Sequence, residues 1–150
     1  MEFLTQEVVA LLAAILLGAM VGMERQLVGH GAGLRTHIMV ALASALFIVI
    51  SRKIGDPSDP VEVARVIQGI AAGVGFIGAG SILKLGPEHE VIGLTTASTI
   101  WLAAAIGTAC GLREFALATS AAVLSIVVLV SLRPIEAHFG KKSKDKQTPM

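Results

Sequence analysis

Residues 69–101 read GIAAGVGFIGAGSILKLGPEHEVIGLTTASTIW, and this stretch decides the class of fold. It places five glycines within twelve residues and carries no charged side chain before Lys84. In a water-soluble helix, each interior glycine would cost roughly 1 kcal/mol relative to alanine. In lipid, the backbone must satisfy its hydrogen bonds internally, so an apolar run of this length is driven into a helix. The stretch therefore predicts the crowded centre of a helical membrane bundle.

The small residues of this stretch have the spacing of helix-packing motifs. Gly69 and Gly73 form a GxxxG pair, and Ala71, Gly75 and Ala79 continue the spacing on a neighbouring face. Small residues at such positions let a second backbone come close. The alternatives are a flexible loop or a re-entrant segment unwound around a ligand. The glycines that we expect to pack against another helix are Gly69, Gly73, Gly75, Gly78 and Gly80.

The composition of the whole chain supports a membrane protein. Of 150 residues, 54% are apolar and 15% are charged, whereas a soluble domain carries about 25% charged residues. The single cysteine, Cys110, excludes an intramolecular disulfide and is expected to be a small packing residue. The first residues, MEFLTQE, lack a positive segment, so we expect no cleaved signal peptide.

Five apolar runs predict five membrane-spanning helices, because about 20 residues cross a 30 Å hydrocarbon core. Asp59-Pro60 suits the start of the third helix, since proline is favoured at the first helical position. We assign residues 1–133 to one transmembrane domain and residues 134–150 to a basic cytoplasmic tail. The predicted spans are about 5–23, 36–51, 66–83, 91–111 and 115–132.

Lysine and arginine counts predict the orientation. With the C-terminus inside, inner segments hold eight of these residues and outer segments hold four. Positive residues concentrate on the cytoplasmic side, so the chain is expected to run N-out and C-in. The lysine-rich tail is either a plain topogenic flank or a contact with anionic lipid.

The sequence contains an internal echo at a shift of sixty residues. Residues 17–45 align without a gap with residues 77–105, and both copies read helix end, polar turn and G-L-x-T. Two helices per copy would make a parallel repeat with its axis along the membrane normal. If this duplication is real, both polar turns face the same side of the membrane.

The polar residues of the chain do not form a catalytic motif, so we do not expect an enzyme. Glu24-Arg25 is followed by G-x-G-L-R-T-H, and charges beside apolar runs require partners or a place at the interface. Glu24 could pair with Arg35 or Arg25, with Arg35 preferred, or could bind a cation. The cluster is thus either an interfacial salt bridge or a functional polar site, and it comprises Glu24, Arg25, Arg35, Thr36 and His37.

A second polar stretch opens the fourth run with four hydroxyls in five residues, including Thr95 and Thr96. These hydroxyls could cap the helix, bond across helices or line an ion path. Trp101 is expected to pack inside the bundle. Ala103, Gly107 and Gly111 predict another face for close helix approach.

Four ordered motifs carry a family resemblance: GMER (22–25), AGLRTH (32–37), GVGFIGAGSI (73–82) and GLTTA (93–97), the last followed by T-I-W. The chain resembles the MgtC/SapB family of bacterial inner-membrane proteins over about residues 8–133. The resemblance implies a multi-pass protein of the bacterial plasma membrane, tied to magnesium limitation and, in pathogens, to survival within macrophages and thus virulence. Its motif positions include Glu24, Arg25, Arg35, Thr36, His37, Thr95 and Thr96.

The resemblance also implies two functional hypotheses. The first is regulation through direct contact with another membrane complex, with the membrane ATP synthase as the candidate. The second is a cation channel or transporter for Mg²⁺, using Glu24 and the Thr95–Thr99 hydroxyls as ligands. Longer family members carry an ACT-like cytoplasmic domain, which we do not expect in this chain. Besides lipid, the expected partner is a second copy or another membrane complex; neither a cofactor nor nucleic acid is expected, although Mg²⁺ remains a candidate ligand.

Overall fold

The computed structural model describes residues 2–29, 31–55, 60–85 and 90–134. Within these residues the chain forms five helices and one two-stranded antiparallel sheet. The elements in chain order are α1 (Glu2–Leu27), α2 (Leu34–Ile54), α3 (Pro60–Gly80), β1 (Leu83–Leu85), β2 (Glu90–Ile92), α4 (Leu94–Gly111) and α5 (Phe115–Ser131).

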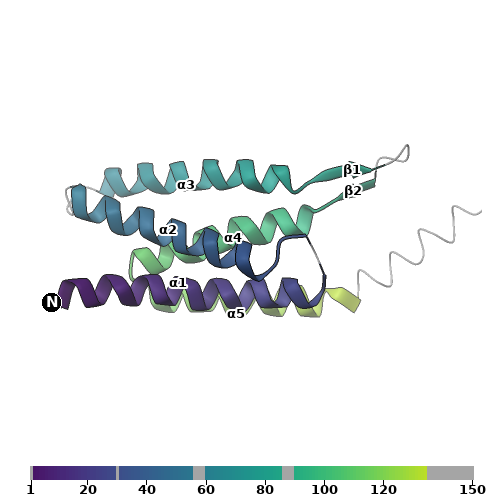
Figure 1. The fold of residues 1–150 in the computed structure, drawn as a ribbon, viewed down its shortest axis with the longest axis horizontal. Coiled ribbons are helices and arrows are strands. Elements are labelled where there is room, and N and C mark those ends of the chain that lie inside the picture. Colours follow the sequence, from purple (N-terminus) through teal and green to yellow (C-terminus); the bar gives the residue numbers. More distant parts are fainter. Residues whose placement is uncertain (1, 30, 56–59, 86–89, 135–150) are drawn as a thin grey trace, which may run out of the picture.

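The helices run alternately up and down along one long axis (Figure 1). One end of the bundle, which we call the hairpin end, holds the α1–α2 turn, the β1–β2 hairpin and the end of α5. The opposite end, which we call the N-terminal end, holds the start of α1 and the α2–α3 and α4–α5 connections. The two polar turns of the predicted repeat therefore lie at the same end, whereas the orientation in the membrane stays a prediction.

Helix lengths confirm the predicted all-helical membrane class. Among the described residues, α1 to α4 are long and apolar enough to cross a membrane. Helix α5 has 17 residues, so its length is roughly 26 Å, close to the thickness of the hydrocarbon core. Helix α3 begins at Pro60, as the proline predicted. The Asp59 cap and residues 135–150 of the predicted tail lie outside the described residues.

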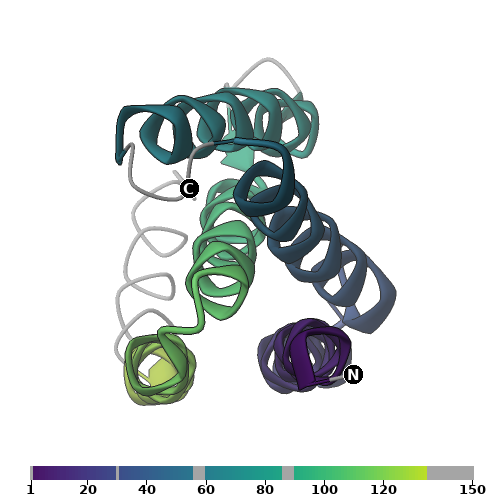
Figure 2. The ribbon, with the colours of Figure 1, turned by 90° about the vertical axis from the view of Figure 1, so that its left-hand side faces the viewer.

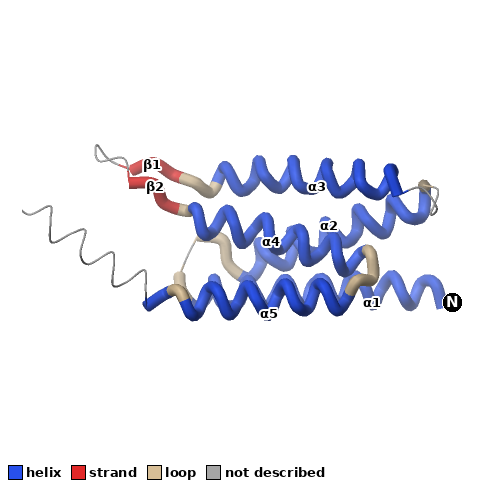
Figure 3. Tube along the Cα trace, turned by 180° about the vertical axis from the view of Figure 1, so that it is seen from behind, coloured by secondary structure: helices blue, strands red, loops and turns tan. Residues whose placement is uncertain are grey.

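Several helix ends differ from the predicted spans. Helix α3 stops at Gly80 rather than residue 83, because the β1–β2 hairpin lies between α3 and α4 (Figure 3). Helix α1 continues through Glu24 and Arg25 to Leu27 instead of stopping near residue 23. The fourth helix begins at Leu94 rather than residue 91, because residues 90–92 pair with β1. Gly93 ends the hairpin with a left-handed φ of 91° and lies against the backbone of Ser81, so a side chain there would be strained and would clash.

Helix α2 lies at the centre of the crowded part of the bundle. It packs against α1, α3 and α4. A Cβ built on Gly18 of α1 would come within 2.9 Å of the Ala41 Cβ. On the other side, a Cβ on Gly107 of α4 would come within 2.7 Å of the Ala41 Cα. The backbone of α2 is thus held between glycines of two neighbouring helices, and Gly22 and Gly111 extend the same contacts toward the two ends.

The main core consists largely of small side chains, which is the composition that close helix packing requires. Cys110 is fully buried in this core, as predicted for a small packing residue. The α4 face predicted for close approach is also confirmed at Ala103, Gly107 and Gly111. The core residues are Ala14, Leu17, Val21, Ala41, Ala45, Ile106, Ala109, Cys110, Ala118 and Ala122.

The prediction that α3 forms the crowded centre of the chain is wrong. A Cβ added at Gly69, Gly73, Gly75 or Gly80 would meet no described atom within 4 Å, and only Gly78 has a neighbour, Ala97. Only 11% of the 18-residue apolar segment of α3 is buried inside the bundle, whereas 61% of the corresponding segment of α4 is buried. Seen along the bundle axis, α3 lies outside α2 and α4, while α1 and α5 lie on the other side (Figure 2). Gly69 and Gly73, which line the same side of the helix and which we call the glycine face of α3, are therefore open.

Trp101 also departs from its prediction, because its residue surface is 53% exposed. It lines a pocket between α3 and α4 instead of filling the core.

The two copies of the predicted repeat begin their second helices at equivalent positions, because Gly33 and Gly93 each immediately precede a helix. Their backbone conformations differ, since Gly33 is extended and Gly93 is left-handed.

We predict opposite effects for two matched glycine substitutions. Gly107→Ala should lower the melting temperature in detergent, because its Cβ clashes with the α2 backbone, and overpacking typically costs about 1–3 kcal/mol. Gly75→Ala should leave the melting temperature unchanged or raise it, because open space surrounds the site and alanine favours helix. Equal destabilisation by both variants would contradict the packing described above.

Candidate functional site

A buried ion cluster lies at the hairpin end of the bundle. Glu24, in the last turn of α1, is the acid of this cluster. Its carboxylate accepts a hydrogen bond from the Arg133 guanidinium, and Arg25 Nη1 lies 3.6 Å from its second oxygen, Oε2. The Glu24 and Arg25 side chains are 9% and 4% exposed, whereas the Arg133 side chain is 42% exposed. The cluster therefore joins the ends of α1 and α5 and opens outward only at Arg133.

Several polar atoms of this end have no hydrogen-bond partner among the described residues. They include Arg25 Nε and Nη2, Glu24 Oε2 and His37 Nε2. The other ring nitrogen of His37, Nδ1, lies 2.8 Å from the Gly33 carbonyl oxygen. Buried polar groups without hydrogen-bond partners are destabilising. A ligand or a protein partner that supplied the missing hydrogen bonds would therefore bind at these atoms.

The predicted pairing of Glu24 with Arg35 is wrong, and the Arg25 alternative is confirmed. Arg35 is exposed in the first turn of α2, whereas Glu24 pairs with Arg25 and Arg133. Arg133 lies 109 positions from Glu24 in sequence, so no local pattern indicates it. His37 is fully buried, and its Cβ lies beside Gly22 of α1. Thr36 is partly buried next to it.

Two of the four hydroxyls at the start of α4 bond within their own helix. Ser98 donates to the Leu94 carbonyl at 2.9 Å, and Thr99 donates to the Thr96 carbonyl at 3.0 Å. Gly93 precedes the helix without a side-chain cap, so the capping interpretation is not what the structure shows. Thr96 is buried, whereas Thr95 is exposed and lines a small pocket with Arg25 and Arg133.

A second buried ion cluster lies at the N-terminal end and was missed from the sequence. Glu7 of α1 is 4% exposed, and Arg113 Nη2 donates to its carboxylate at 2.6 Å. Arg113 also donates to the Gln6 side chain and has a left-handed φ of 66°. Arg52 of α2 donates to the Gly111 carbonyl at 3.2 Å nearby. The available signal for Glu7 was a carboxylate inside the first predicted span, just before its apolar run.

The described residues hold no group of three or more His, Cys, Asp or Glu that could bind a metal ion. Glu7 and Glu24 of α1 are instead each paired with arginine, one near each end of the helix. Mg²⁺ prefers one or two carboxylates with several retained waters, and Glu24 Oε2 is buried without a hydrogen bond among the described residues, although it faces Arg25 Nη1.

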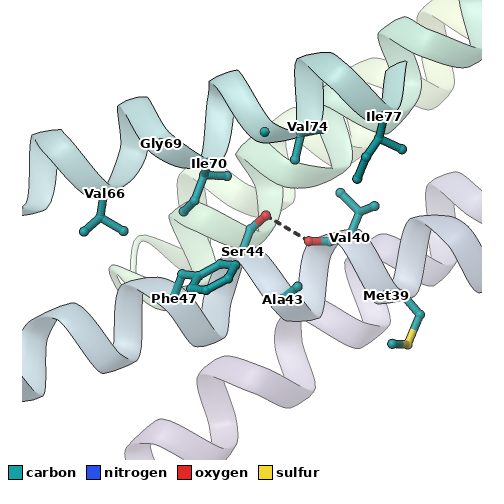
Figure 4. Close-up of a pocket in the computed structure, with 11 residues that line it drawn as sticks. Met39, Val40, Ala43, Ser44, Phe47, Val66, Gly69, Ile70, Val74 and Ile77 are labelled. Atoms are coloured by element: carbon teal, nitrogen blue, oxygen red, sulfur yellow. Dashed lines mark hydrogen bonds between the residues drawn. The ribbon is translucent and has the colours of Figure 1, made fainter. Parts of the chain in front are cut away.

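An apolar groove runs between α2 and α3 (Figure 4). It has a volume of about 710 Å³, and its α3 wall carries Gly69 and Gly73. Ser44, its polar lining residue, donates its hydroxyl to the Val40 carbonyl at 2.8 Å, so it is satisfied within α2. The remaining lining side chains are Met39, Val40, Ala43, Phe47, Val66, Ile70, Val74 and Ile77.

These features define a small multi-pass helical membrane protein with buried ion clusters at both ends and an open glycine face on α3. The profile of the MgtC family matches residues 11–138. The chain belongs to the MgtC family, which confirms the resemblance drawn from its four motifs.

Named relatives agree with this assignment. The chain is 46% identical over 118 residues to Protein SrpB of Synechococcus elongatus, covering 71% of the chain and 65% of SrpB. It is 43% identical over 125 residues to Protein MgtC of Brucella abortus, covering 83% of the chain and 50% of that protein. It is 42% identical over 124 residues to the protein named "Putative magnesium transporter YhiD" of Escherichia coli, covering 79% of the chain and 56% of YhiD.

The chain spans about half to two thirds of the length of these curated relatives. No solved structure matches it. The family model and the apolar helices establish the family and the membrane character of the chain.

We predict that Glu24 couples energetically to Arg133 and not to Arg35. In a double-mutant cycle of Glu24→Gln and Arg133→Gln, detergent melting should show coupling of about 0.5–1 kcal/mol, because Arg133 is partly exposed. The cycle of Glu24→Gln with Arg35→Gln should be additive to within about 0.5 kcal/mol. Strong coupling to Arg35 would restore the pairing that the structure corrects.

Proposed function

We propose that the chain is a regulatory protein of the bacterial plasma membrane that acts by helix–helix contact with another membrane complex. The candidate partner is the membrane ATP synthase, which the resemblance to the MgtC/SapB family implies. The regulation is proposed to act when magnesium is limiting. The proposed contact surface is the groove between α2 and α3, together with the glycine face of α3.

The observation that carries this proposal is the open space around the α3 glycines. Within the described chain, Gly69 and Gly73 line the groove and have no neighbour within 4 Å of an added Cβ. In lipid, a helix gains little from burying apolar surface, so association depends on close backbone approach at small residues. The glycines that α2 uses inside the bundle lie on α1 and α4, which leaves the α3 set available for a partner.

The chemistry of the groove specifies the class of occupant. Its described lining is apolar and carries no charged side chain, so a polar peptide or a soluble domain would leave its own polar groups unpaired. A transmembrane helix satisfies its backbone internally and presents only side chains. We therefore assign the groove to a transmembrane helix of the partner complex, and a second copy of this chain is the outcome that the test must separate.

Magnesium transport is the second candidate, because one relative is named "Putative magnesium transporter YhiD". The arrangement of charges favours it less. The acids Glu7 and Glu24 lie near opposite ends of α1 and are paired with arginines. No acidic side chain lies in the middle of the described helices, where a permeating Mg²⁺ would need replacement of its waters.

We predict that Gly73→Leu abolishes partner contact while preserving the fold. Gly73 lines the groove, whereas Gly75 lies on the same helix outside the groove lining, and both positions are open. Gly73→Leu should therefore remove crosslinking to the ATP synthase in membranes, and Gly75→Leu should retain it, with similar melting temperatures for both. Loss of self-crosslinking alone would assign the groove to a second copy, and unchanged crosslinking in both variants would reject the groove.

Transport is tested separately by reconstitution. We expect liposomes that contain only this protein to show no Mg²⁺ uptake above protein-free liposomes, with a dye-loaded interior as the readout. Uptake that disappears in Glu24→Gln but persists in Gly73→Leu would favour the transporter and contradict the regulatory proposal.

A further inference from the structure

A small pocket at the hairpin end lies between the ends of α1 and α5 and the start of α4. Its volume is about 120 Å³. The polar part of its wall comes from Arg25, Thr95 and Arg133, and the apolar part from Val28, Val128, Leu129 and Leu132. The pocket is thus lined by two arginines and an exposed threonine beside the apolar end of α5.

The hydrogen-bonding state of Arg25 indicates what the pocket lacks. The residue is 3% exposed, and its Nη1 faces Glu24. Nε and Nη2, which form the other edge of the guanidinium, have no partner within the described chain. That edge carries two parallel N–H donors, the geometry that binds two oxygens of one phosphate or carboxylate group.

The charge of the cluster also favours an anion. Glu24 provides one negative charge, and Arg25 and Arg133 provide two positive charges, so one positive charge is left for a ligand to neutralise. A divalent cation would have to approach past two guanidinium groups. An anion in the pocket would instead gain the unused donors of Arg25 once that guanidinium turns toward it, and neutralising a buried charge with good hydrogen-bond geometry is favourable.

We propose that this pocket binds a phosphate group through the free edge of Arg25, with Arg133 and the Thr95 hydroxyl as further donors. The Arg25 edge is closed to solvent, so binding turns its guanidinium toward the pocket that the side chain already lines. Two sources supply such a group at a membrane surface: the headgroup of an anionic phospholipid and free phosphate. The apolar end of α5 continues from the pocket, and basic pockets between helices at the membrane surface suit lipid headgroups. The proposal is independent of partner docking at the α2–α3 groove.

The test uses the intact protein in a neutral detergent. Melting temperature and lipid retention by native mass spectrometry are measured during titration with phosphatidylglycerol, with phosphatidylcholine, and with inorganic phosphate. We expect saturable stabilisation by phosphatidylglycerol and a much weaker effect of phosphatidylcholine, whose headgroup carries no net charge. If inorganic phosphate stabilises equally or displaces the lipid, free phosphate is the source; if it does neither, the lipid headgroup is the source.

The variants separate this pocket from general charge attraction. Arg25→Gln should weaken phosphatidylglycerol binding at least about tenfold, as expected for loss of a charge-assisted pair. Arg35→Gln removes the same charge from an exposed position at the same end, outside the pocket lining, and should retain tight binding. Equal losses in the two variants, or equal responses to the two lipids, would overturn the proposal.

A third variant covers the case in which Arg25→Gln does not fold. Thr95 is exposed and lines the pocket, so Thr95→Val should leave the melting temperature of the lipid-free protein unchanged. It should still weaken phosphatidylglycerol binding severalfold, because one donor to the phosphate is lost. Unchanged binding in Thr95→Val would then reject the assigned pocket.

Discussion

The close approach between the α2 backbone and the glycines of α1 and α4 is the contact on which the other features depend. Ala41 has Gly18 on one side and Gly107 on the other, so three helix axes come together without large side chains between them. Alanines fill most of the remaining core. Because small residues complete this centre, the larger apolar side chains of α3 and α5 are left facing outward, and α3 becomes a peripheral helix with an unused glycine face.

Charges are buried at both ends of this closely packed bundle. Glu7 meets Arg113 at one end, and Glu24 meets Arg25 and Arg133 at the other. Each cluster ties α1 to residues far away in the chain, and thereby fixes how α1 sits beside α5 and the α4–α5 turn. Breaking a buried pair is destabilising because it leaves an uncompensated charge. Packing of small residues thus stabilises the middle of the bundle, and ion pairs fix the relative positions of the helices at its ends.

Much of the fold could be predicted from the sequence, because apolar runs of membrane length and their polar breaks are local signals. The five helices and the Ala103–Gly107–Gly111 face followed from them. The partner of each glycine pair could not be predicted: Gly18–Gly22 and Gly69–Gly73 have the same GxxxG spacing, and only the arrangement of helices makes the first internal and the second open. The pairing of Glu24 with Arg133 was missed for the same reason, since it joins residues far apart in the chain, whereas Arg35 is near Glu24 in sequence but does not pair with it.

The two ion clusters also fix a length. Glu7 and Glu24 are separated by 17 positions of one helix, which is roughly 26 Å at 1.5 Å per residue. The hydrocarbon core of a typical bilayer is about 30 Å thick. The buried charges therefore bracket the apolar part of α1 at nearly the thickness of the membrane. Mismatch between the apolar length of a protein and the thickness of the bilayer costs fractions of a kcal/mol per Å. The ion clusters add a limit, because tilting or shifting the bundle too far would move a charged group into the hydrocarbon.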